Sequence, residues 1–216
     1  MTRLPDDELA ERRGYHHGNL RQVLIEAARR LIAERGPAGF TLSDAAKLAG
    51  VSPAAPYRHF KDRQTLLREV AKQGFDALHQ RLAAAAKGSE SEGFFAMGKA
   101  YLAFAREEPA YYAAMFNTGL SEEQKSGRAD PGFALLVEAV GKALGGGDET
   151  QMRMAAYLVF ALTHGLASLA APGSVANSGS SAELGGPPSP ERALEVGVDA
   201  LLTGLSLQFG TPRPSR

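Results

Sequence analysis

Residues 41–60 constrain the fold of this chain more tightly than any other segment, because they contain two helix starts and a turn. Thr41 and Asp44 have the spacing and order of a capping box, which begins a helix. Gly50 can adopt the left-handed backbone conformation that commonly ends a helix. The segment from Thr41 to Gly50 therefore predicts a short helix followed by a tight turn.

A second helix is predicted directly after this turn. Ser52 can cap it, and Pro53 can occupy its first position, where a missing backbone N–H costs little. Two short helices joined by a tight turn form a helix-turn-helix, whose second helix enters the major groove of DNA. Pro56 removes an early hydrogen bond from a helix that begins at Pro53, so we expect a shifted or distorted start.

The segments that flank the motif extend the pattern. Residues 13–21 read Arg-Gly-Tyr-His-His-Gly-Asn-Leu-Arg, residues 50–62 read Gly-Val-Ser-Pro-Ala-Ala-Pro-Tyr-Arg-His-Phe-Lys-Asp, and two leucines follow at 66–67. With these segments the chain resembles the TetR family of transcriptional regulators over residues 14–70. The aromatic and basic residues at 57–61 are the most specific part, because helix–glycine–helix patterns also occur in ordinary helical bundles.

The resemblance implies an all-α fold, in which a three-helix DNA-binding domain precedes a helical bundle that binds a ligand and dimerises. We expect a flexible arm at 1–13, the helix-turn-helix domain at 14–61, the ligand-binding and dimerisation domain at 62–210, and a loose tail at 211–216. Residues 172–189 are rich in Gly, Ser and Pro and are expected to form a disordered loop.

Apolar periodicity and local caps predict the individual helices, about nine in all, and no segment predicts a strand. Asn19 is expected to cap the first helix, Asp62 a long one that follows the motif, and Ser89 the helix after that. Outside the motif, the predicted helices end near residues 35, 87, 108, 117, 144, 171 and 210.

Composition excludes several classes of protein. Hydrophobic residues make up 44% and charged residues 22% of 216, which is typical of a globular chain with a substantial core. The chain has no cysteine, which excludes disulfides, thiol nucleophiles and thiolate metal sites. We find no long uninterrupted apolar run and no signal-peptide pattern at residues 1–11, so we predict a cytoplasmic protein with no membrane partner.

Charge is divided unevenly along the chain, although the net charge is zero. Residues 1–73 hold 13 Lys+Arg against 9 Asp+Glu, and residues 74–216 hold 11 against 15. A basic N-terminal part can attract a phosphate backbone, while an acidic remainder discourages nonspecific wrapping of DNA. The excess is modest and supports the motif without replacing it.

Small side chains occupy the start of the predicted recognition helix. Ser52, Pro53, Ala54 and Ala55 should face base edges, and none can make the forked contacts of Arg, Asn or Gln. Alanine methyl groups can pack on thymine methyl groups. Specificity is therefore expected to depend on Arg58, on the N-terminal arm or on DNA shape.

Contacts to the DNA backbone are expected beside these positions. The resemblance places Tyr57, His59 and Lys61 near the phosphates, where a tyrosine hydroxyl can donate and a lysine adds positive charge. Thr41, at the start of the preceding helix, can also donate to a phosphate. The alternative for Tyr57 and His59 is a half-buried packing role, whereas Phe60 is expected to lie in the core.

Adjacent histidines precede the first helix. His16 and His17, with Tyr15, Arg12 and Arg13, could reach a minor groove as a flexible arm, or could form a solvated tail. With no cysteine and no nearby acid at ligand spacing, these histidines predict no metal site.

Aromatic residues are frequent in the helical body, where the resemblance implies a small-molecule site. An aromatic stripe is more often core than pocket, but tyrosines carry a hydroxyl that a ligand can use. The lining predicts an apolar or aromatic effector, and no cofactor is expected. The candidate ligand-binding residues are Tyr101, Phe104, Tyr111, Tyr112, Met115, Phe116, Phe160 and His164.

Residues 160–165 are similar to the signature of a TetR subgroup named for a Trp, a His and a Gly. Phe160 stands at the Trp position here, and the chain contains no tryptophan. This departure weakens any inference of an indole-lined pocket. His164 has two interpretations, since it can bond to a neighbouring helix within the core or to a ligand.

Small residues recur at helical spacing on the last two predicted helices and suggest a homodimer interface. Such stripes let helices approach closely, and two helices from each subunit would form a four-helix bundle. The alternative is packing within one subunit. The candidate interface residues are Ala161, Gly165, Ser168, Ala193, Gly197, Ala200 and Gly204.

These expectations favour a repressor that binds a pseudo-palindromic DNA operator as a homodimer and is released by a small-molecule effector. A second hypothesis is a DNA-binding regulator with no ligand, whose body serves only dimerisation. A third is a helical enzyme that uses His164 with a tyrosine or an acid. The sequence contains no convincing Ser/His/Asp set and no phosphate-binding loop, so we expect no enzyme.

Overall fold

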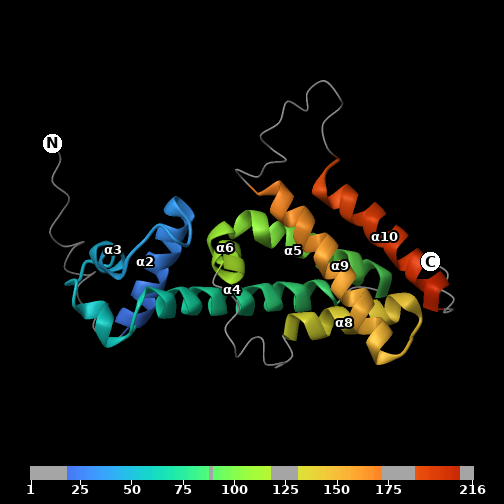
Figure 1. Cartoon of the computed structure of the whole chain (residues 1–216), viewed down its shortest axis with the longest axis horizontal. Helices are drawn as coiled ribbons and strands as arrows, with labels where there is room; N and C mark the ends of the chain where they lie inside the picture. The colour runs from blue at the N-terminus through green and yellow to red at the C-terminus, as the bar shows by residue number, and fades with distance from the viewer. Residues whose placement is uncertain (1–18, 88–89, 118–130, 172–187, 210–216) are drawn as a thin grey trace, which may run out of the picture. The chain divides into compact units, whose positions relative to one another are not determined.

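A computed structural model describes residues 19–87, 90–117, 131–171 and 188–209 of the chain. These ranges contain eight α-helices and one 3-10 helix and no strand, which confirms the predicted all-α fold. The chain divides into two compact units, and Figure 1 shows the helices of each. Residues 1–74 and 110–119 belong to the first unit, and residues 75–109 and 120–216 belong to the second.

The first unit is built on the predicted helix-turn-helix. It contains α2 (Leu20–Arg35), α3 (Leu42–Leu48), the 3-10 helix η1 (Ala55–Arg58) and all but the first residue of α6 (Pro109–Asn117). Residues 63–74 of α4 (Arg63–Ala85) complete it. The core side chains are Leu24, Ile25, Ala28, Leu31, Phe40, Ala45, Phe60, Leu66 and Val70.

Local hydrogen bonds explain where these helices begin. The Thr41 side chain accepts the Asp44 N–H, and the Asp44 carboxylate accepts the Thr41 N–H, so the predicted capping box is present. Asp62 accepts the Thr65 N–H at 2.7 Å and caps α4 as predicted. Asn19 stands at the N-cap of α2 but makes no side-chain capping bond, so that prediction was wrong.

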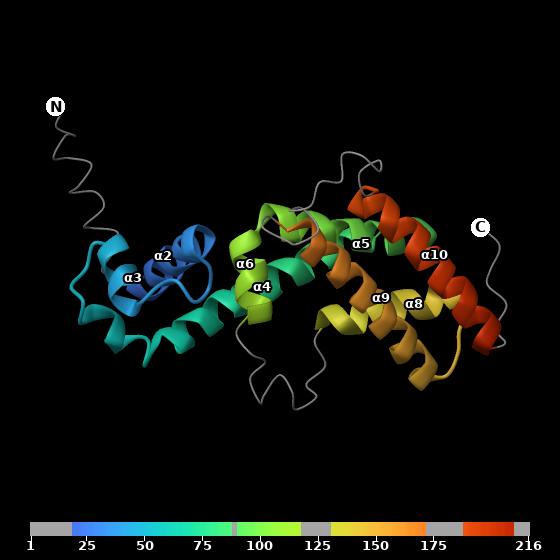
Figure 2. The same ribbon diagram turned by 45° about the horizontal axis from the view of Figure 1, so that its top comes forward.

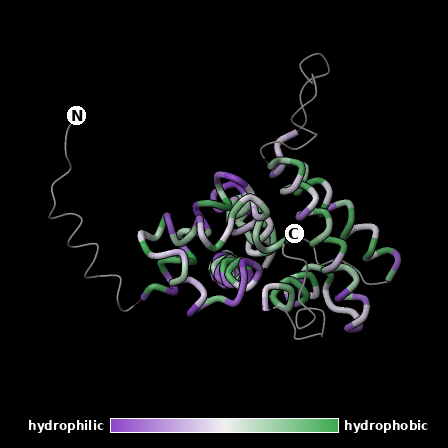
Figure 3. Tube along the Cα trace, turned by 60° about the vertical axis from the view of Figure 1, so that its left-hand side comes forward, coloured by the Kyte–Doolittle hydropathy of each residue, from purple (hydrophilic) through white to green (hydrophobic). Residues whose placement is uncertain are grey.

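The second unit consists of helices that pack around α9. It contains residues 75–85 of α4, then α5 (Glu90–Glu107), α8 (Pro131–Leu144), α9 (Glu149–Ala170) and α10 (Pro190–Phe209). Helix α9 contacts α5, α8 and α10, and it lies beside α10 in both ribbon views (Figures 1 and 2). Figure 3 shows hydrophobic and hydrophilic residues interleaved along the helices, as expected for amphipathic packing.

Most helix bounds in this unit agree with the prediction to within a few residues. The Ser189 hydroxyl accepts the Arg192 N–H and caps α10 as expected. Asp148 and Gln151 form a capping box at the start of α9 that sequence reasoning missed. The predicted cap at Ser89 and the predicted loop at 172–189 fall largely outside the described residues.

Among the described helices, α9 is the one long and apolar enough to cross a membrane by length and composition. Its Ala155, Val159 and Thr163 are buried among neighbouring helices, so we interpret it as the core helix of this unit.

Candidate DNA-binding surface and ligand cavity

The recognition element differs from the predicted helix in both type and start. Helix η1 begins at Ala55, and the Ser52 side chain does not cap it. Instead the Ser52 carbonyl accepts the Ala55 N–H at 3.0 Å in the preceding turn. Because Pro56 has no N–H, a regular α-helix from Pro53 would lose an early hydrogen bond, and a short 3-10 turn accommodates this loss. The start is therefore shifted and distorted, as Pro56 predicted, whereas Ser52 as the cap and Pro53 as the first helical residue were wrong.

Helix η1 presents its polar side chains to solvent and buries two anchors. Tyr57 is 60% exposed, which argues against a half-buried packing role. Arg58 and His59 are also exposed, whereas Pro56 and Phe60 are buried. The predicted base-edge residues lie beside them: Ser52, Pro53 and Ala54 are exposed and Ala55 is partly exposed.

Phe60 fixes this loop to the core of the first unit, as predicted. Its ring is 1% exposed, and the Arg21 guanidinium lies 5.3 Å from the ring centroid. Arg21 also forms an ion pair with Glu69 of α4 at 2.8 Å. The buried Phe60 ring and its contact with Arg21 therefore anchor the loop that carries Tyr57.

Positive charge is available on the exposed side of this loop. Arg58 and Lys61 are exposed and form no ion pair with any described carboxylate. Lys47 on α3 and Arg68 on α4 are exposed as well. Such cations can neutralise phosphates when the surface meets DNA.

The Thr41 hydroxyl, which was predicted to donate to a phosphate, already takes part in the capping box. It donates to the Asp44 carboxylate at 2.6 Å and accepts the Asp44 N–H at 3.1 Å. The bonds that the Thr41 hydroxyl and the Thr41 backbone N–H donate to the Asp44 carboxylate lower the pKa of that carboxyl, which stays ionised at neutral pH. A phosphate contact from Thr41 would have to compete with this carboxylate. The arm with His16 and His17 lies outside the described residues.

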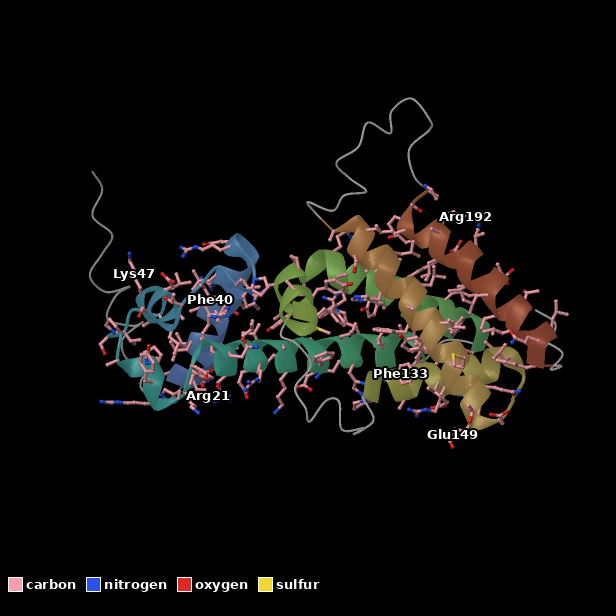
Figure 4. All side chains as sticks on the ribbon, in the orientation of Figure 1. Arg21, Phe40, Lys47, Phe133, Glu149 and Arg192 are labelled. Carbon is pink, nitrogen blue, oxygen red and sulfur yellow. The ribbon has the colours of Figure 1, made fainter. Side chains whose placement is uncertain are left out.

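A cavity of about 540 Å³ lies within the second unit, a size typical of small-molecule sites. Side chains from α4, α5, α8, α9 and α10 enclose it, and most of them are apolar or aromatic. Figure 4 shows the side chains of this unit and labels Phe133, a lining residue on α8.

Only part of the predicted ligand-binding set lines this cavity. Tyr101 and Phe160 line it. His164 lies next to them, where its Nδ1 atom is 3.0 Å from the Tyr101 hydroxyl and its ring stacks on Phe160. Burial lowers the pKa of the His164 imidazole below its usual value of 6.5. His164 is partly buried and bonds to Tyr101 of the neighbouring helix α5, and its role as a core or ligand-contacting residue stays a prediction.

The remaining predicted ligand residues lie elsewhere. Phe104 is 1% exposed and packs beneath the Arg81 guanidinium. Met115 packs against Gly74 in the first unit. The other three belong to the same helix, α6, and none lines the cavity: Tyr111, Tyr112 and Phe116. These five residues do not line this cavity, because an aromatic helix can serve either unit and sequence spacing does not say which. Their role in binding a ligand stays a prediction.

Helix α4 supplies a cavity wall that sequence reasoning missed. Phe75, Leu78, His79 and Leu82 recur at helical spacing and all line the cavity. This spacing is visible in the sequence, but none of these residues was among the candidate ligand-binding residues. Arg153, on α9, also lines the cavity and was not singled out.

The exposed faces of α9 and α10 are unusually apolar. Leu207 is 81% exposed, and Met154, Tyr157, Leu169 and Val196 are each more than half exposed. The predicted interface residues lie among them: Ala161, Ser168, Ala200 and Gly204 are exposed, and Gly165 and Ala193 are partly exposed.

Gly197 differs from the other predicted interface residues. A Cβ atom there would lie 2.9 Å from Leu162 of α9, so this glycine serves packing within the chain. A Cβ atom added at Gly165 or at Gly204 would have no atom within 4 Å.

Comparison with known proteins assigns both parts of the chain to one family. Residues 24–70 match the description "bacterial regulatory proteins, tetR family". Residues 94–201, half of the chain, match "Tetracyclin repressor-like, C-terminal domain". The chain belongs to the TetR family of transcriptional regulators. The likeness of residues 160–165 to the Trp-His-Gly subgroup stays a prediction.

Curated relatives of this TetR-family regulator match mainly its N-terminal part. It is 42% identical over 72 residues to the HTH-type transcriptional regulator TtgR of Pseudomonas putida, covering 33% of this chain and 32% of TtgR. It is 33% identical over 69 residues to the HTH-type transcriptional regulator BetI of Rhizobium meliloti, covering 32% of this chain and 34% of BetI. The match therefore spans about a third of the length of these relatives.

Solved structures extend the likeness over most of the chain. A protein of unknown function from Rhodococcus sp. RHA1 has a TM-score of 0.67 at 31% identity, covering 89% of this chain and 98% of that one. The TetR-family regulator PfmR from Thermus thermophilus has a TM-score of 0.60 at 21% identity, covering 83% and 97%, and shares the fold. The named relatives are transcriptional regulators, a class that is generally not enzymatic.

Proposed function

We propose that this TetR-family regulator is a homodimeric repressor that binds a pseudo-palindromic operator through η1 and is released by a small molecule. One observation carries the proposal: α4 belongs to both units. Its residues 63–74 belong to the unit that carries the recognition loop, and its later residues Phe75, Leu78 and His79 line the cavity. The same helix therefore serves the DNA-binding unit and the cavity.

The surface of η1 supports the DNA-binding step. Tyr57 and Lys61 are exposed on a loop anchored by buried Phe60. The hydroxyl and the ammonium group can contact phosphates, which position a protein on the duplex. Arg58 is the side chain of η1 best able to read a base edge, because Ala54 and Ala55 offer only methyl groups.

Release requires that the effector prefer one state of the regulator. A ligand that binds equally well to the DNA-bound and free states would shift nothing. Some ligands would favour a position of α4 that does not fit the operator. Such a ligand lowers the affinity for the operator by as much as it prefers the free state over the DNA-bound state. The operator lowers the affinity for the ligand by the same factor. We propose α4 as the element that transmits this preference.

The apolar faces of α9 and α10 support the homodimer. Large exposed apolar patches mark interaction sites on soluble proteins. A twofold interface uses the same patch on both subunits, so Leu207 and Val196 would meet their equivalents or α9 of the second copy. Two reading heads related by this axis suit half-sites one helical turn, about 34 Å, or a multiple apart.

A regulator without a ligand remains the second candidate. It would be favoured by a closed aromatic core, and the cavity beside Tyr101 counts against it. An enzyme that uses His164 is poorly supported, because the imidazole faces the Tyr101 hydroxyl rather than the cavity. We infer a cytoplasmic location and no membrane partner, consistent with a regulator that must reach DNA.

Footprinting on the DNA upstream of the chain's own gene tests this proposal. We expect protection of two half-sites related by dyad symmetry, with centres about 34 Å or a multiple apart. Transcription from the protected promoter should rise when the gene for the regulator is deleted. A single protected half-site would contradict the dimer, and a fall in transcription would contradict repression.

A further inference from the structure

The cavity in the second unit contains a specific combination of polar groups. Among its described lining residues there is no carboxylate, and Arg153 is the one side chain that is permanently charged. His79 is the other strongly polar group. The remaining lining is mostly aromatic and aliphatic, so these two residues offer most of the polar contacts that could select a ligand.

Arg153 lines the cavity and is itself exposed to solvent, so it brings a hydrated positive charge to the cavity. Its guanidinium lies 5.9 Å from the centroid of the Phe133 ring, which also lines the cavity. It forms no ion pair with any carboxylate in the described ranges. The contact with the ring orients the guanidinium but leaves its N–H donors free for an anion. A carboxylate can accept two of these donors at once.

His79 provides a second polar group of the lining, on a side chain that is partly exposed. Its Nδ1 atom has no hydrogen-bond partner among the described residues and is inaccessible to solvent, so a ligand would reach it only after the imidazole ring turns toward the cavity. A buried polar atom without a partner is unfavourable, which favours such a turn when a bound group can satisfy the atom. A hydroxyl suits this atom with either imidazole tautomer, because a hydroxyl can both donate and accept.

Two other polar side chains of the lining are already engaged. The Tyr101 hydroxyl lies 3.0 Å from Nδ1 of His164. The Thr163 hydroxyl donates to the Val159 carbonyl within α9 at 2.8 Å. A ligand would have to break these bonds to use either group. Tyr157 also lines the cavity, on a side chain that is 59% exposed, so Arg153, His79 and the Tyr157 hydroxyl remain to select the ligand.

We propose that the cavity binds a hydroxylated aromatic carboxylic acid. The rings of residues such as Phe94 and Phe160 pack against its aromatic body. Arg153 binds the carboxylate, and Nδ1 of His79 bonds to the hydroxyl. The role of this acid as the effector rests on the proposed function. The site disfavours amines, because they meet a positive charge and no described acid.

Matched naphthalene probes test this ligand class. The chain contains no tryptophan, so naphthalene fluorescence can be excited with little interference from the protein. We would titrate the full chain with 6-hydroxy-2-naphthoic acid, its methyl ester, 2-naphthoic acid and 2-naphthylmethylamine. The hydroxy acid should bind about two- to fivefold more tightly than its ester, as expected for an ion pair at an exposed arginine. The amine should bind most weakly.

Three variants at two cavity residues and one matched control test which protein group contacts which part of the ligand. Arg153→Gln should remove the preference for acid over ester, and Arg153→Lys should retain part of it. His79→Phe should weaken the hydroxy acid and leave 2-naphthoic acid unchanged. Lys87→Gln removes one exposed positive charge from the same unit outside the cavity lining and should alter neither preference. Circular dichroism should confirm that each variant is folded.

The proposal is overturned if the ester or the amine binds as well as the acid, if none of the probes binds, or if Arg153→Gln keeps the preference. Its failure is separable from failure of the proposed function. If the hydroxy acid binds with the predicted preferences but does not alter the operator footprint, the ligand class stands and the effector role fails. If a neutral or cationic compound releases the operator and the acids do not bind, the release mechanism stands and this ligand class is wrong.

Discussion

In the recognition loop, different residues anchor the loop to the core and are available to contact DNA. Phe60 is buried beneath Arg21, while Tyr57, three positions earlier, is 60% exposed. The spacing turns one aromatic ring inward and the other outward within one short segment. Lys61 follows directly and is also exposed. This arrangement makes the expected DNA contacts separable by mutation from the stability of the unit.

Removal of the Lys61 charge should reduce the salt dependence of DNA binding. For Lys61→Gln, the slope of log affinity against log salt should fall by about 1, because one fewer phosphate is neutralised. Fluorescence anisotropy of a labelled operator at several salt concentrations measures this slope. Lys87→Gln is the matched control, since it removes an exposed lysine outside the first unit. Equal slopes for both variants would argue against a phosphate contact at Lys61.

His164 should make the stability of the second unit depend on pH. Burial lowers the pKa of this imidazole in the folded state below the ordinary value of 6.5. The unfolded chain therefore takes up a proton more readily than the folded chain as the pH falls through that value. The resulting contribution to stability is complete above about pH 6.5 and is lost as the pH falls below it.

Urea unfolding between about pH 8 and pH 5 checks this expectation. The wild-type free energy of unfolding should decline at the acidic end, and His164→Gln should decline less. His59→Gln removes an exposed histidine from the recognition loop and should follow the wild type. If His164→Gln shows the same pH dependence as the wild type, another group is responsible.

At the scale of elements, the sequence predicted helices well and their partners poorly. Capping pairs such as Thr41 with Asp44 are local, so they fix helix starts from a few residues. Helix α6 was correctly bounded but placed beside the cavity, whereas Met115 packs against Gly74 of α4 in the first unit. Which face a helix buries depends on residues distant in the sequence, and spacing alone does not reveal them.

Helix η1 illustrates a second limit. Pro56 signalled a distorted start, yet nothing in the sequence distinguished a shifted α-helix from a 3-10 turn. The two differ by one hydrogen-bond register, which neighbouring packing decides. The cavity wall formed by Leu78, His79 and Leu82 was readable as a helical stripe, but its facing residues came from four other helices. The domain bounds and site residues therefore stay predictions that mutation must test.

The close approach of α4 and α6 should tolerate little added volume. A Cβ atom at Gly74 would lie 2.8 Å from Sδ of Met115 and 3.0 Å from Cβ of Tyr111. Gly74→Leu should therefore destabilise the chain by about 1–3 kcal/mol, as overpacking does. Ala84→Leu, at an exposed position of α4, is the control and should be near neutral. Urea unfolding measures both, and an unchanged Gly74→Leu variant would contradict this packing.

At the scale of the whole molecule, the apolar faces of α9 and α10 predict a dimer. Leu207→Glu places a charge where a second subunit would bury an apolar side chain, which is strongly unfavourable. Sedimentation velocity should find the wild type as a dimer and this variant largely as a monomer. Gln208→Glu adds the same charge at the next position and should stay dimeric. A monomeric wild type would remove the basis for two reading heads.

Binding of the wild-type chain to DNA from its own upstream intergenic region tests whether η1 reads an operator. We would measure it by mobility shift at about 50 mM and about 200 mM salt, against an unrelated duplex of equal length. We expect selective binding that weakens with salt and is reduced at least about tenfold by Tyr57→Ala, which deletes a hydroxyl expected to bond to a charged phosphate. Selective binding that Tyr57→Ala leaves intact would contradict η1 as the reading head, and equal binding to both duplexes would contradict an operator in that region.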